Sequence, residues 1–387
     1  MSNYLTLLYP VVSVTWLKNN LNATNLVVLD GTIAKVFNAD SQQIPKARFF
    51  NIKETFSNVN APFPSTFPSQ TQFQTEAQNL GINNDSAIVV YDDKGIYSSA
   101  RVWWLFKAFG YNNVAVLDGG LPAWLKHNFQ TENAKLYTGE KGNFIANLQS
   151  ECMMFFNDVK QASNNKTHTI IDARSSGRFS GKDPEPREGL RSGTIPNSVN
   201  LPFTNLLKNG ALKEEETIAK AFSNVIKSKN EPVIFSCGSG ITACVLALGA
   251  EISGYKNLAV YDGSWTEWGT LVPASMERPS TWTKQQLIAY ILLYVAHSDL
   301  NESNKEKAYI LNRVDTNVYK LVYERFEKDN DYQSIENIIE AVKAHDYFRN
   351  DLADLFADIK LMAFADGDFK PMEQMVYNQL RHILKHG

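Results

Sequence analysis

The chain has 387 residues, which at about 150 residues per domain corresponds to two or three domains. Hydrophobic residues make up 44% and charged residues 20%, a composition that excludes a disordered chain, a collagen-like repeat and a coiled-coil rod. The 38 basic and 41 acidic residues leave a net charge of -3, which argues against a nucleic-acid or membrane-binding surface, so we expect a small-molecule or protein partner.

Cysteine content and hydropathy predict a cytoplasmic protein. The three cysteines, Cys152, Cys237 and Cys244, are too few for a disulfide framework and favour a reducing compartment. The apolar opening at residues 4–16 is interrupted by polar residues and has no basic residue before it, unlike a signal peptide. No uncharged run reaches the about 18 residues that a membrane span needs.

The first half alternates short apolar runs with helical segments. Val27–Asp30 and Ala87–Tyr91 have the length of buried strands, and residues 101–109 follow the second run with helical spacing. Strands that are each followed by a helix favour a parallel sheet of the α/β class. Residues 131–150 are polar and unpatterned, as expected of a connector.

The second half repeats the first. Residues 110–119, Gly-Tyr-Asn-Asn-Val-Ala-Val-Leu-Asp-Gly, recur at 254–263 as Gly-Tyr-Lys-Asn-Leu-Ala-Val-Tyr-Asp-Gly, an offset of 144 positions. Ile44 and Pro45 recur as Ile195 and Pro196 at an offset of 151, so the second copy carries an insertion after Asp172. The repeat predicts two tandem parallel-sheet domains, at residues 1–135 and 150–272.

Residues 283–387 predict a smaller all-α domain. Of the 21 glycines and 14 prolines, only Gly367, Gly387 and Pro371 lie there. Apolar residues recur at helical spacing in three stretches, which are Leu287, Ile288, Ile291, Leu292 and Val295, then Leu352, Leu355, Phe356 and Ile359, then Val376, Leu380, Ile383 and Leu384. We expect about five helices. A faint internal repeat places Asp299 seven residues before Glu306 and Asp366 seven before Glu373.

The strongest candidate for chemistry is the loop Cys237-Gly238-Ser239-Gly240-Ile241-Thr242. A cysteine at the carboxyl end of a buried strand, just before a helix, lies where open α/β sheets place their ligands. Converging loop amides and the helix N-terminus favour the thiolate there, and the two glycines permit dihedrals that a Cβ would obstruct. The alternative is a buried structural cysteine in a tight turn. Position and loop composition together favour a reactive cysteine.

Several further motifs, in order along the chain, point to one family. They are Val102-Trp103-Trp104, Leu117-Asp118-Gly119-Gly120, Asp172-Ala173-Arg174, Gly177-Arg178-Phe179, Pro184-Glu185-Pro186-Arg187, Ser192-Gly193-Thr194-Ile195-Pro196-Asn197 and Asn200-Leu201-Pro202-Phe203. With the Cys237 loop, they resemble the tandem rhodanese-type sulfurtransferases, particularly the 3-mercaptopyruvate branch, over roughly residues 8–270.

The resemblance implies one catalytic and one degenerate rhodanese module. Asp92 stands at the cysteine position of the first half, and a carboxylate cannot carry sulfane sulfur, so residues 1–135 would be a scaffold. Cys237 would attack the sulfur of 3-mercaptopyruvate or thiosulfate, form a persulfide and pass the outer sulfur to a thiol or cyanide. Amides of Gly238, Gly240, Ile241 and Thr242 would stabilise the anions, with no metal and no cofactor.

The resemblance also implies how the donor binds. Arg178 and Arg187 match the two arginines that hold the donor carboxylate in the mercaptopyruvate branch, a role that suits the planar guanidinium. Their alternative is a solvated or salt-bridged pair in the insertion. Ser239 matches a loop serine that takes part in proton transfer in that branch. Gln43 and Thr194 replace family histidines, so Ser239 would serve only as a hydrogen-bond donor.

Two other classes of function differ from sulfur transfer in the residues they require. A rhodanese-related phosphatase would need an arginine six positions after the cysteine, where this chain has Ala243. A persulfide carrier or docking module without turnover stays open because of Gln43 and Thr194. The six histidines show no metal-ligand spacing. The remaining candidates are interpreted as packing residues or unactivated thiols. They are the cysteines Cys152 and Cys244 and the tryptophans Trp124 and Trp268.

The helical segment resembles the TerB-like domains of tellurite-resistance proteins. The segments that carry this likeness are Val295-Ala296-His297-Ser298-Asp299 and Ala363-Phe364-Ala365-Asp366-Gly367-Asp368. We expect Asp299 and Asp366 to cap helices or lie in turns rather than to bind metal, because the spacing of a calcium loop is missing. The resemblance implies a protein partner for residues 283–387 in interaction or regulation.

Overall fold

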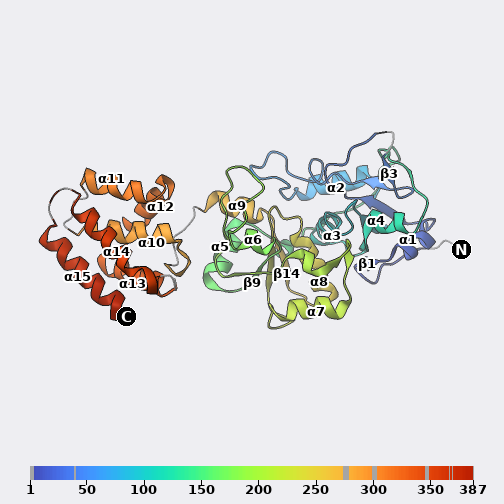
Figure 1. The fold of residues 1–387 in the computed structure, drawn as a ribbon. Coiled ribbons are helices and arrows are strands. Elements are labelled where there is room, and N and C mark those ends of the chain that lie inside the picture. The colour runs from blue at the N-terminus through green and yellow to red at the C-terminus, as the bar shows by residue number, and fades with distance from the viewer. Residues whose placement is uncertain are drawn as a thin grey trace. The chain divides into compact units, whose positions relative to one another are not determined.

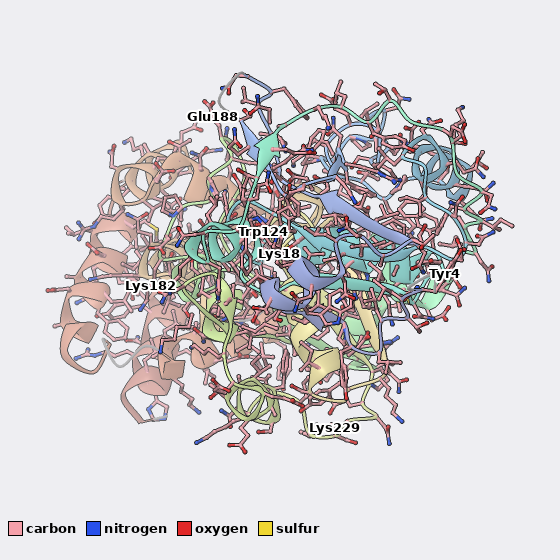
Figure 2. All side chains as sticks on the ribbon, turned by 90° about the vertical axis from the view of Figure 1, so that its right-hand side faces the viewer. Tyr4, Lys18, Trp124, Lys182, Glu188 and Lys229 are labelled. Carbon is pink, nitrogen blue, oxygen red and sulfur yellow. The ribbon has the colours of Figure 1, made fainter. Side chains whose placement is uncertain are left out.

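The computed structural model describes residues 4–38, 41–272, 279–298, 303–344, 348–365, 367 and 369–386 (Figure 1). The chain divides into two compact units, residues 1–272 and 273–387. In the described ranges, every helix is too short or too polar to cross a bilayer. Exposed lysines such as Lys18, Lys182 and Lys229 lie on the outside of the first unit, whereas Trp124 is fully buried (Figure 2).

The first half of unit 1 is a parallel sheet with the strand order β1-β6-β5-β2-β4. Its strands are β1 (Val11–Val12), β2 (Leu26–Asp30), β4 (Arg48–Phe49), β5 (Ala87–Tyr91) and β6 (Val114–Leu117). Its helices are α1 (Val14–Asn20), α2 (Gln70–Asn79), α3 (Ser99–Ala108) and α4 (Gly120–Lys126). The central strands are apolar throughout because both faces of the sheet are covered.

The second half builds the same sheet again, in the order β8-β14-β13-β9-β10 when read from the corresponding edge. Its strands are β8 (Met153–Met154), β9 (Thr169–Asp172), β10 (Ser198–Asn200), β13 (Val233–Ser236) and β14 (Leu258–Tyr261). Its helices are α5 (Phe156–Asn165), α6 (Ser176–Phe179), α7 (Glu215–Ser223), α8 (Ala243–Ile252) and α9 (Ser264–Leu271). The predicted fold class, two tandem parallel-sheet domains and an all-α region, is confirmed.

Two antiparallel strand pairs complete unit 1. β3 (Gln42–Gln43) pairs with β7 (Glu132–Asn133), and β11 (Leu207–Lys208) pairs with β12 (Ala211–Leu212). Short 3-10 turns are η1 (Ser150–Cys152) and η2 (Phe203–Leu206), with η3 (Pro279–Thr281) in unit 2.

One apolar cluster joins the two halves of unit 1. It runs from β5 through α3 and α8, which pack against each other, to β13, and includes Trp103, Leu246 and Phe235. Separate clusters around Trp124 and Trp268 cover the outer faces of the two sheets, so these residues are packing residues as expected. Because the halves share one core, the two sheets are held as a single body.

Aspartates at corresponding positions also cross-link the halves. The Asp118 carboxylate accepts the backbone N–H of Leu212 at 2.9 Å, and the Asp262 carboxylate accepts that of Phe67 at 2.7 Å. Each aspartate follows the strand next to the centre of its own sheet and reaches into the other half. The recurrence of Asp118 and Asp262 in the sequence therefore reflects the pairing of the halves and more than a local turn.

The described part of unit 2 contains six α-helices, one more than the sequence pattern predicted. They are α10 (Lys284–Ala296), α11 (Asn304–Arg313), α12 (Thr316–Phe326), α13 (Asp331–Ala344), α14 (Phe348–Ala363) and α15 (Pro371–His386). α10 is buried on nearly every side by the other helices, with Leu287, Ile291 and Val295 fully covered. A helix that is apolar all round has to lie in the centre of a bundle.

In the described part of unit 2, Glu306 and Glu373 are fully buried, each in the first turn of a helix. Glu306 accepts the N–H of Ser303 at 2.7 Å in a capping box, and Glu373 accepts that of Lys370 at 2.9 Å. Asp299 and Asp366, the other acids of the faint repeat, lie outside the described residues. Burial and then the neighbouring Glu306 carboxyl raise the pKa of Glu373 to about 7, against the lowering effect of the Lys370 N–H.

This carboxyl pair predicts a pH-dependent stability for unit 2. The native state binds the Glu373 proton more tightly than the unfolded chain does, so stability present below pH 4.5 should fall as the pH rises through about 7. Glu373→Gln should abolish that fall, because the amide cannot ionise. Calorimetry of the unit 2 transition at pH 5 and pH 8 measures the difference, and the exposed Glu336→Gln is the matched control that keeps it. Equal pH dependence in the Glu373→Gln variant and the wild type would contradict the assignment.

Candidate active site

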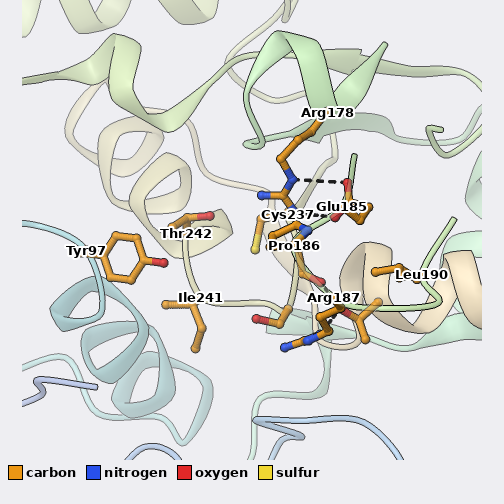
Figure 3. A pocket seen from close by; sticks show the side chains of 12 residues that line it. Tyr97, Arg178, Glu185, Pro186, Arg187, Leu190, Cys237, Ile241 and Thr242 are labelled. Carbon is orange, nitrogen blue, oxygen red and sulfur yellow. Dashed lines mark hydrogen bonds and ion pairs between the residues drawn. The ribbon is translucent and has the colours of Figure 1, made fainter. Parts of the chain in front are cut away.

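Cys237 follows β13 directly, at the carboxyl end of the central strand of the second sheet. Its side chain is buried and borders a cavity of about 250 Å³ (Figure 3). Both halves of unit 1 contribute to the lining, which is Tyr97, Arg178, Glu185, Pro186, Arg187, Leu190, Cys237, Gly238, Ser239, Ile241, Thr242 and Thr266. The cavity therefore lies where the parallel-sheet rule predicts a ligand site.

Seven of the eight site residues expected from the sequence line this cavity, and Gly240 does not. Gly240 has φ +72°, and a Cβ there would meet the Asp262 carbonyl at 2.5 Å. Its N–H donates to Ser264 at 3.1 Å, and its carbonyl accepts from Arg101 at 3.3 Å. Gly240 thus shapes the loop through its contacts with Ser264, Arg101 and the Asp262 carbonyl.

The start of α9 holds the Cys237 loop in place. The Ser264 hydroxyl accepts the N–H of Cys237 at 3.0 Å and of Gly240 at 3.1 Å, and donates to the Tyr261 carbonyl at 2.8 Å. The sequence pattern did not identify Ser264, but the repeat carries the signal. Ser264 stands where the first copy has Gly120, and both have positive φ, at 50° and 53°. A serine in that region is unusual and points to a constrained site.

Four loop amides, those of Gly238, Ser239, Ile241 and Thr242, donate to no protein acceptor within the described part of the chain. These four amides lie before α8, in the loop that leads from β13 into the helix. In a cavity that holds a sulfur atom, such amides are available to an anion.

The first half shows what the corresponding loop does with an anion. Asp92 follows β5 as Cys237 follows β13, as the sequence alignment of the halves predicted. Its carboxylate accepts the N–H groups of Lys94 at 2.9 Å, Tyr97 at 2.9 Å and Ser99 at 2.8 Å. Burial raises the pKa of Asp92, and these backbone donors lower it. The degenerate loop therefore encloses a permanent carboxyl group where the Cys237 loop has a sulfur.

Arg178 and Arg187 both reach the cavity, and each is partly engaged. Arg178 donates to Glu185 through Nε at 3.2 Å and Nη2 at 2.5 Å, which leaves its Nη1 without a protein acceptor in the described structure. Glu185 is buried and also accepts from Arg174 at 2.8 Å. Arg187 donates to the Thr266 hydroxyl, and burial lowers its pKa while the nearby Cys237 raises it. Arg178 thus forms a salt bridge, as the alternative interpretation predicted. Its Nη1 group still has no acceptor in the described structure and remains available in the cavity.

The positions expected to hold family histidines lie elsewhere. Gln43 is buried in β3, where its amide donates to the Ala47 carbonyl at 3.0 Å and to Glu132 at 2.9 Å. The Thr194 hydroxyl pairs with Ser198 at 2.9 Å. Neither residue lines the cavity, so neither position supplies a group beside Ser239.

Tyr97 is a titratable residue of the cavity that sequence reasoning missed. It comes from the first half, five residues after Asp92, and its ring packs edge-on to Phe203 with centroids 5.9 Å apart. Burial and then the proximity of Cys237 raise the pKa of its phenol. The phenol therefore stays protonated at neutral pH and can donate a hydrogen bond into the cavity.

The other two cysteines have no such surroundings. Cys244 is fully buried in α8, where its thiol donates to the Gly240 carbonyl at 3.3 Å and burial raises its pKa to about 12. Burial raises the pKa of Cys152 to about 11. Searching the described residues for metal sites yields no group of three or more His, Cys, Asp or Glu side chains. Of the three cysteines, Cys237 alone lines the cavity.

Comparison with known proteins finds matches along unit 1. Residues 13–127 and 156–271 each match the rhodanese-like domain family. The 3-mercaptopyruvate sulfurtransferase of Mus musculus is 39% identical over 232 residues, covering 59% of this chain and 77% of that one. The thiosulfate sulfurtransferase of Rattus norvegicus is 36% identical over 279 residues, 68% of this chain and 93% of its own. The crystal structure of the 3-mercaptopyruvate sulfurtransferase SseA from Escherichia coli superposes with a TM-score of 0.59 at 31% identity, covering 66% and 99% of the two chains.

The anchoring of the loop by Ser264 gives a direct prediction. Ser264→Ala leaves the buried amides of Cys237 and Gly240 without an acceptor, which should cost about 1–3 kcal/mol of stability. It should also slow alkylation of Cys237, because the loop loses its geometry. Denaturant unfolding and the rate of iodoacetamide labelling measure the two effects. The matched control is Ser236→Ala, since the buried Ser236 hydroxyl has no hydrogen-bond partner and its loss should change neither quantity. Identical behaviour of the two variants would contradict the anchoring role.

Proposed function

The chain belongs to the rhodanese-like family and is a sulfurtransferase, and for this enzyme we propose a reaction that moves sulfane sulfur through a Cys237 persulfide. The proposed donor is 3-mercaptopyruvate, with thiosulfate as second choice, and the acceptor is a thiol or cyanide. One observation carries the proposal. Cys237 shares its cavity with two arginines and with loop amides that have no protein acceptor.

The first step joins two sulfur atoms. The Cys237 thiolate attacks the sulfur of mercaptopyruvate, a sulfur–sulfur bond forms, and the carbon–sulfur bond breaks with its electron pair going to carbon. The resulting enolate of pyruvate takes up a proton and leaves. Amides of Gly238, Ile241 and Thr242 would stabilise the sulfur anion before and after the transfer. Asp92 in the first half supports this role, because the same kind of loop there holds a carboxylate with three N–H groups.

The donor carboxylate would bind between the arginines. Arg178 offers its Nη1, and Arg187 offers the part of its guanidinium that does not contact Thr266. The buried Glu185 neutralises part of the positive charge of Arg178, so the site suits a monoanion better than the dianion thiosulfate. Gly238 and Ser239 stand where thiosulfate-preferring relatives of the family place basic residues, which favours the same choice.

Hydrogen-bond donors around the cavity would assist the leaving group. The Ser239 hydroxyl has no protein partner in the described structure and would donate to the pyruvyl oxygen as charge develops on it. The protonated phenol of Tyr97 lies across the cavity from Arg187 and Leu190 (Figure 3) and would donate a hydrogen bond to the donor as well. In the second step, an acceptor thiolate or cyanide attacks the outer sulfur, and Cys237 leaves as a thiolate.

Three further expectations stay predictions. Residues 283–387 would be a TerB-like domain, supported by the sequence segments 295–299 and 363–368 and by the helices α10 to α15. A protein partner would bind through this domain. A cytoplasmic location is supported by three cysteines that are all free.

Persulfide formation is the first test of the proposed reaction. Incubation with mercaptopyruvate should add one sulfur atom to the intact protein, and Cys237→Ser should show no addition. Intact-mass spectrometry detects the adduct, and dithiothreitol should remove it. Addition of sulfur to the wild type without any release to thiols would instead indicate a persulfide carrier. No adduct with either donor would leave a docking role.

The arginine clamp makes a separate prediction about donor choice. Arg178→Ala and Arg187→Ala each remove a charge-assisted hydrogen bond, which should raise KM for mercaptopyruvate about tenfold or more. KM for thiosulfate should rise less, because that donor lacks a carboxylate. Steady-state kinetics with both donors measure the ratio. Lys182→Ala, which removes an exposed charge from the same insertion, should leave both KM values unchanged. Equal increases for the two donors would count against a carboxylate clamp.

A further inference from the structure

Arg101 is a buried cation that connects the first half to the Cys237 loop. It lies in the first turn of α3, is 1% exposed and does not line the cavity. Its guanidinium donates to the Gly240 carbonyl at 3.3 Å, to the Ser65 carbonyl at 3.1 Å and to the Asp262 carboxylate at 2.7 Å. One side chain of the degenerate half therefore joins three groups, of which two belong to the half that carries Cys237.

The internal repeat supplies a comparison for this contact. By the offset of 144 positions, the residue that corresponds to Arg101 in the second half is Val245. The carboxylates of Asp118 and Asp262 accept corresponding hydrogen bonds from Leu212 and Phe67. The two halves therefore contact each other at two corresponding places, which we call crossings. One crossing contains the arginine and the other does not.

At the crossing without the arginine, the two backbones touch directly. The Ile96 N–H donates to the Gly210 carbonyl at 2.9 Å, and a Cβ on Gly95 would lie 2.3 Å from that carbonyl oxygen. Ile96 corresponds to Ile241, Gly95 to Gly240 and Gly210 to Ser65, all at an offset of 145. The direct bond uses the loop amide of Ile96, so that amide is not available to any ligand.

At the crossing beside Cys237, the guanidinium takes the place of the direct contact. It bonds the carbonyls of both chain segments, Gly240 and Ser65, and the Ile241 N–H donates to no acceptor in the described part of the chain. We propose that Arg101 is a positioning residue. By standing between the two backbones, it keeps the Ile241 amide free for the sulfur anion. The part of this inference that concerns sulfur rests on the proposed function.

The residue types fit this role. A planar guanidinium presents several N–H donors in fixed directions, so one group serves two carbonyls and a carboxylate. Asp262 is 3% exposed and balances the buried charge, and the Phe67 N–H holds its second oxygen. Since the charge is balanced, the main effect of Arg101 on the cavity is geometric. Cys244 of α8 also interacts with Arg101, but burial raises the pKa of its thiol to about 12, so it stays protonated. The charged and titratable groups that line the cavity, Arg178, Arg187, Glu185 and Tyr97, form no hydrogen bond with Arg101.

The test measures alkylation of Cys237 by iodoacetamide as a function of pH in the full chain, with peptide mass spectrometry to separate the three cysteines. The double variant Arg101→Met with Asp262→Asn removes the guanidinium and the charge of its carboxylate partner together, so no buried charge is left unpaired. We expect its rate at pH 7 to fall about tenfold and the pH of half-maximal rate to rise by about one unit, since the thiolate loses an amide donor. Asp118→Asn weakens the corresponding cross-link on the other side and should keep the wild-type profile.

Arg101→Lys keeps the charge opposite Asp262 but lacks the fork, so its rate at pH 7 should fall about threefold. This single variant decides the matter if the double variant does not fold. Wild-type alkylation profiles in folded Arg101 variants, or equal shifts in the Asp118→Asn control, would overturn the inference. Persulfide formation by the wild type is measured separately. If the wild type forms none while the alkylation profile of the Arg101 variants still shifts, the proposed sulfur transfer fails and the positioning role stands.

Discussion

The loop that leads from a buried parallel strand into the next helix has several N–H groups that no backbone carbonyl accepts, and both halves of unit 1 are built around that deficit. In the first half, the Asp92 carboxylate fills it with three hydrogen bonds. In the second half, Cys237 stands in the same place, and four amides of its loop, those of Gly238, Ser239, Ile241 and Thr242, have no acceptor among the described residues. The same backbone geometry thus serves as an internal structural contact in one half and as an anion site in the other.

The differences between the halves lie in the segments that surround this shared geometry. The insertion after Asp172 brings Arg178, Glu185 and Arg187 over the Cys237 loop, and the first half has no counterpart. Ser264 replaces Gly120 and fastens the loop from below. The sheet order, the central helices and the aspartate cross-links are the same in both halves, because they make the shared core.

The sequence predicted the parts of the site that belong to one continuous motif. The repeat indicated the two sheets, and the Cys237 loop indicated the cavity, because strand, loop and helix follow one another in the chain. Arg178 and Arg187 were expected only from the family resemblance. Tyr97 and Arg101 were missed since their roles depend on how one half meets the other. Gly240 was assigned to the substrate, yet its backbone faces Ser264 and Arg101. In unit 2, the periodic apolar stretches indicated helices but did not resolve one of the six.

The guanidinium of Arg101 also bears on how the duplicated chain can change over evolutionary time. The nucleophile belongs to one copy, while the side chain that separates its loop from the opposing backbone belongs to the other. Selection for reactivity in the second copy would therefore act on a helix of the first, although that copy carries Asp92 in place of a cysteine. The two copies contribute different parts of one arrangement. A chain with two first copies would lack Cys237, and a chain with two second copies would lack Arg101.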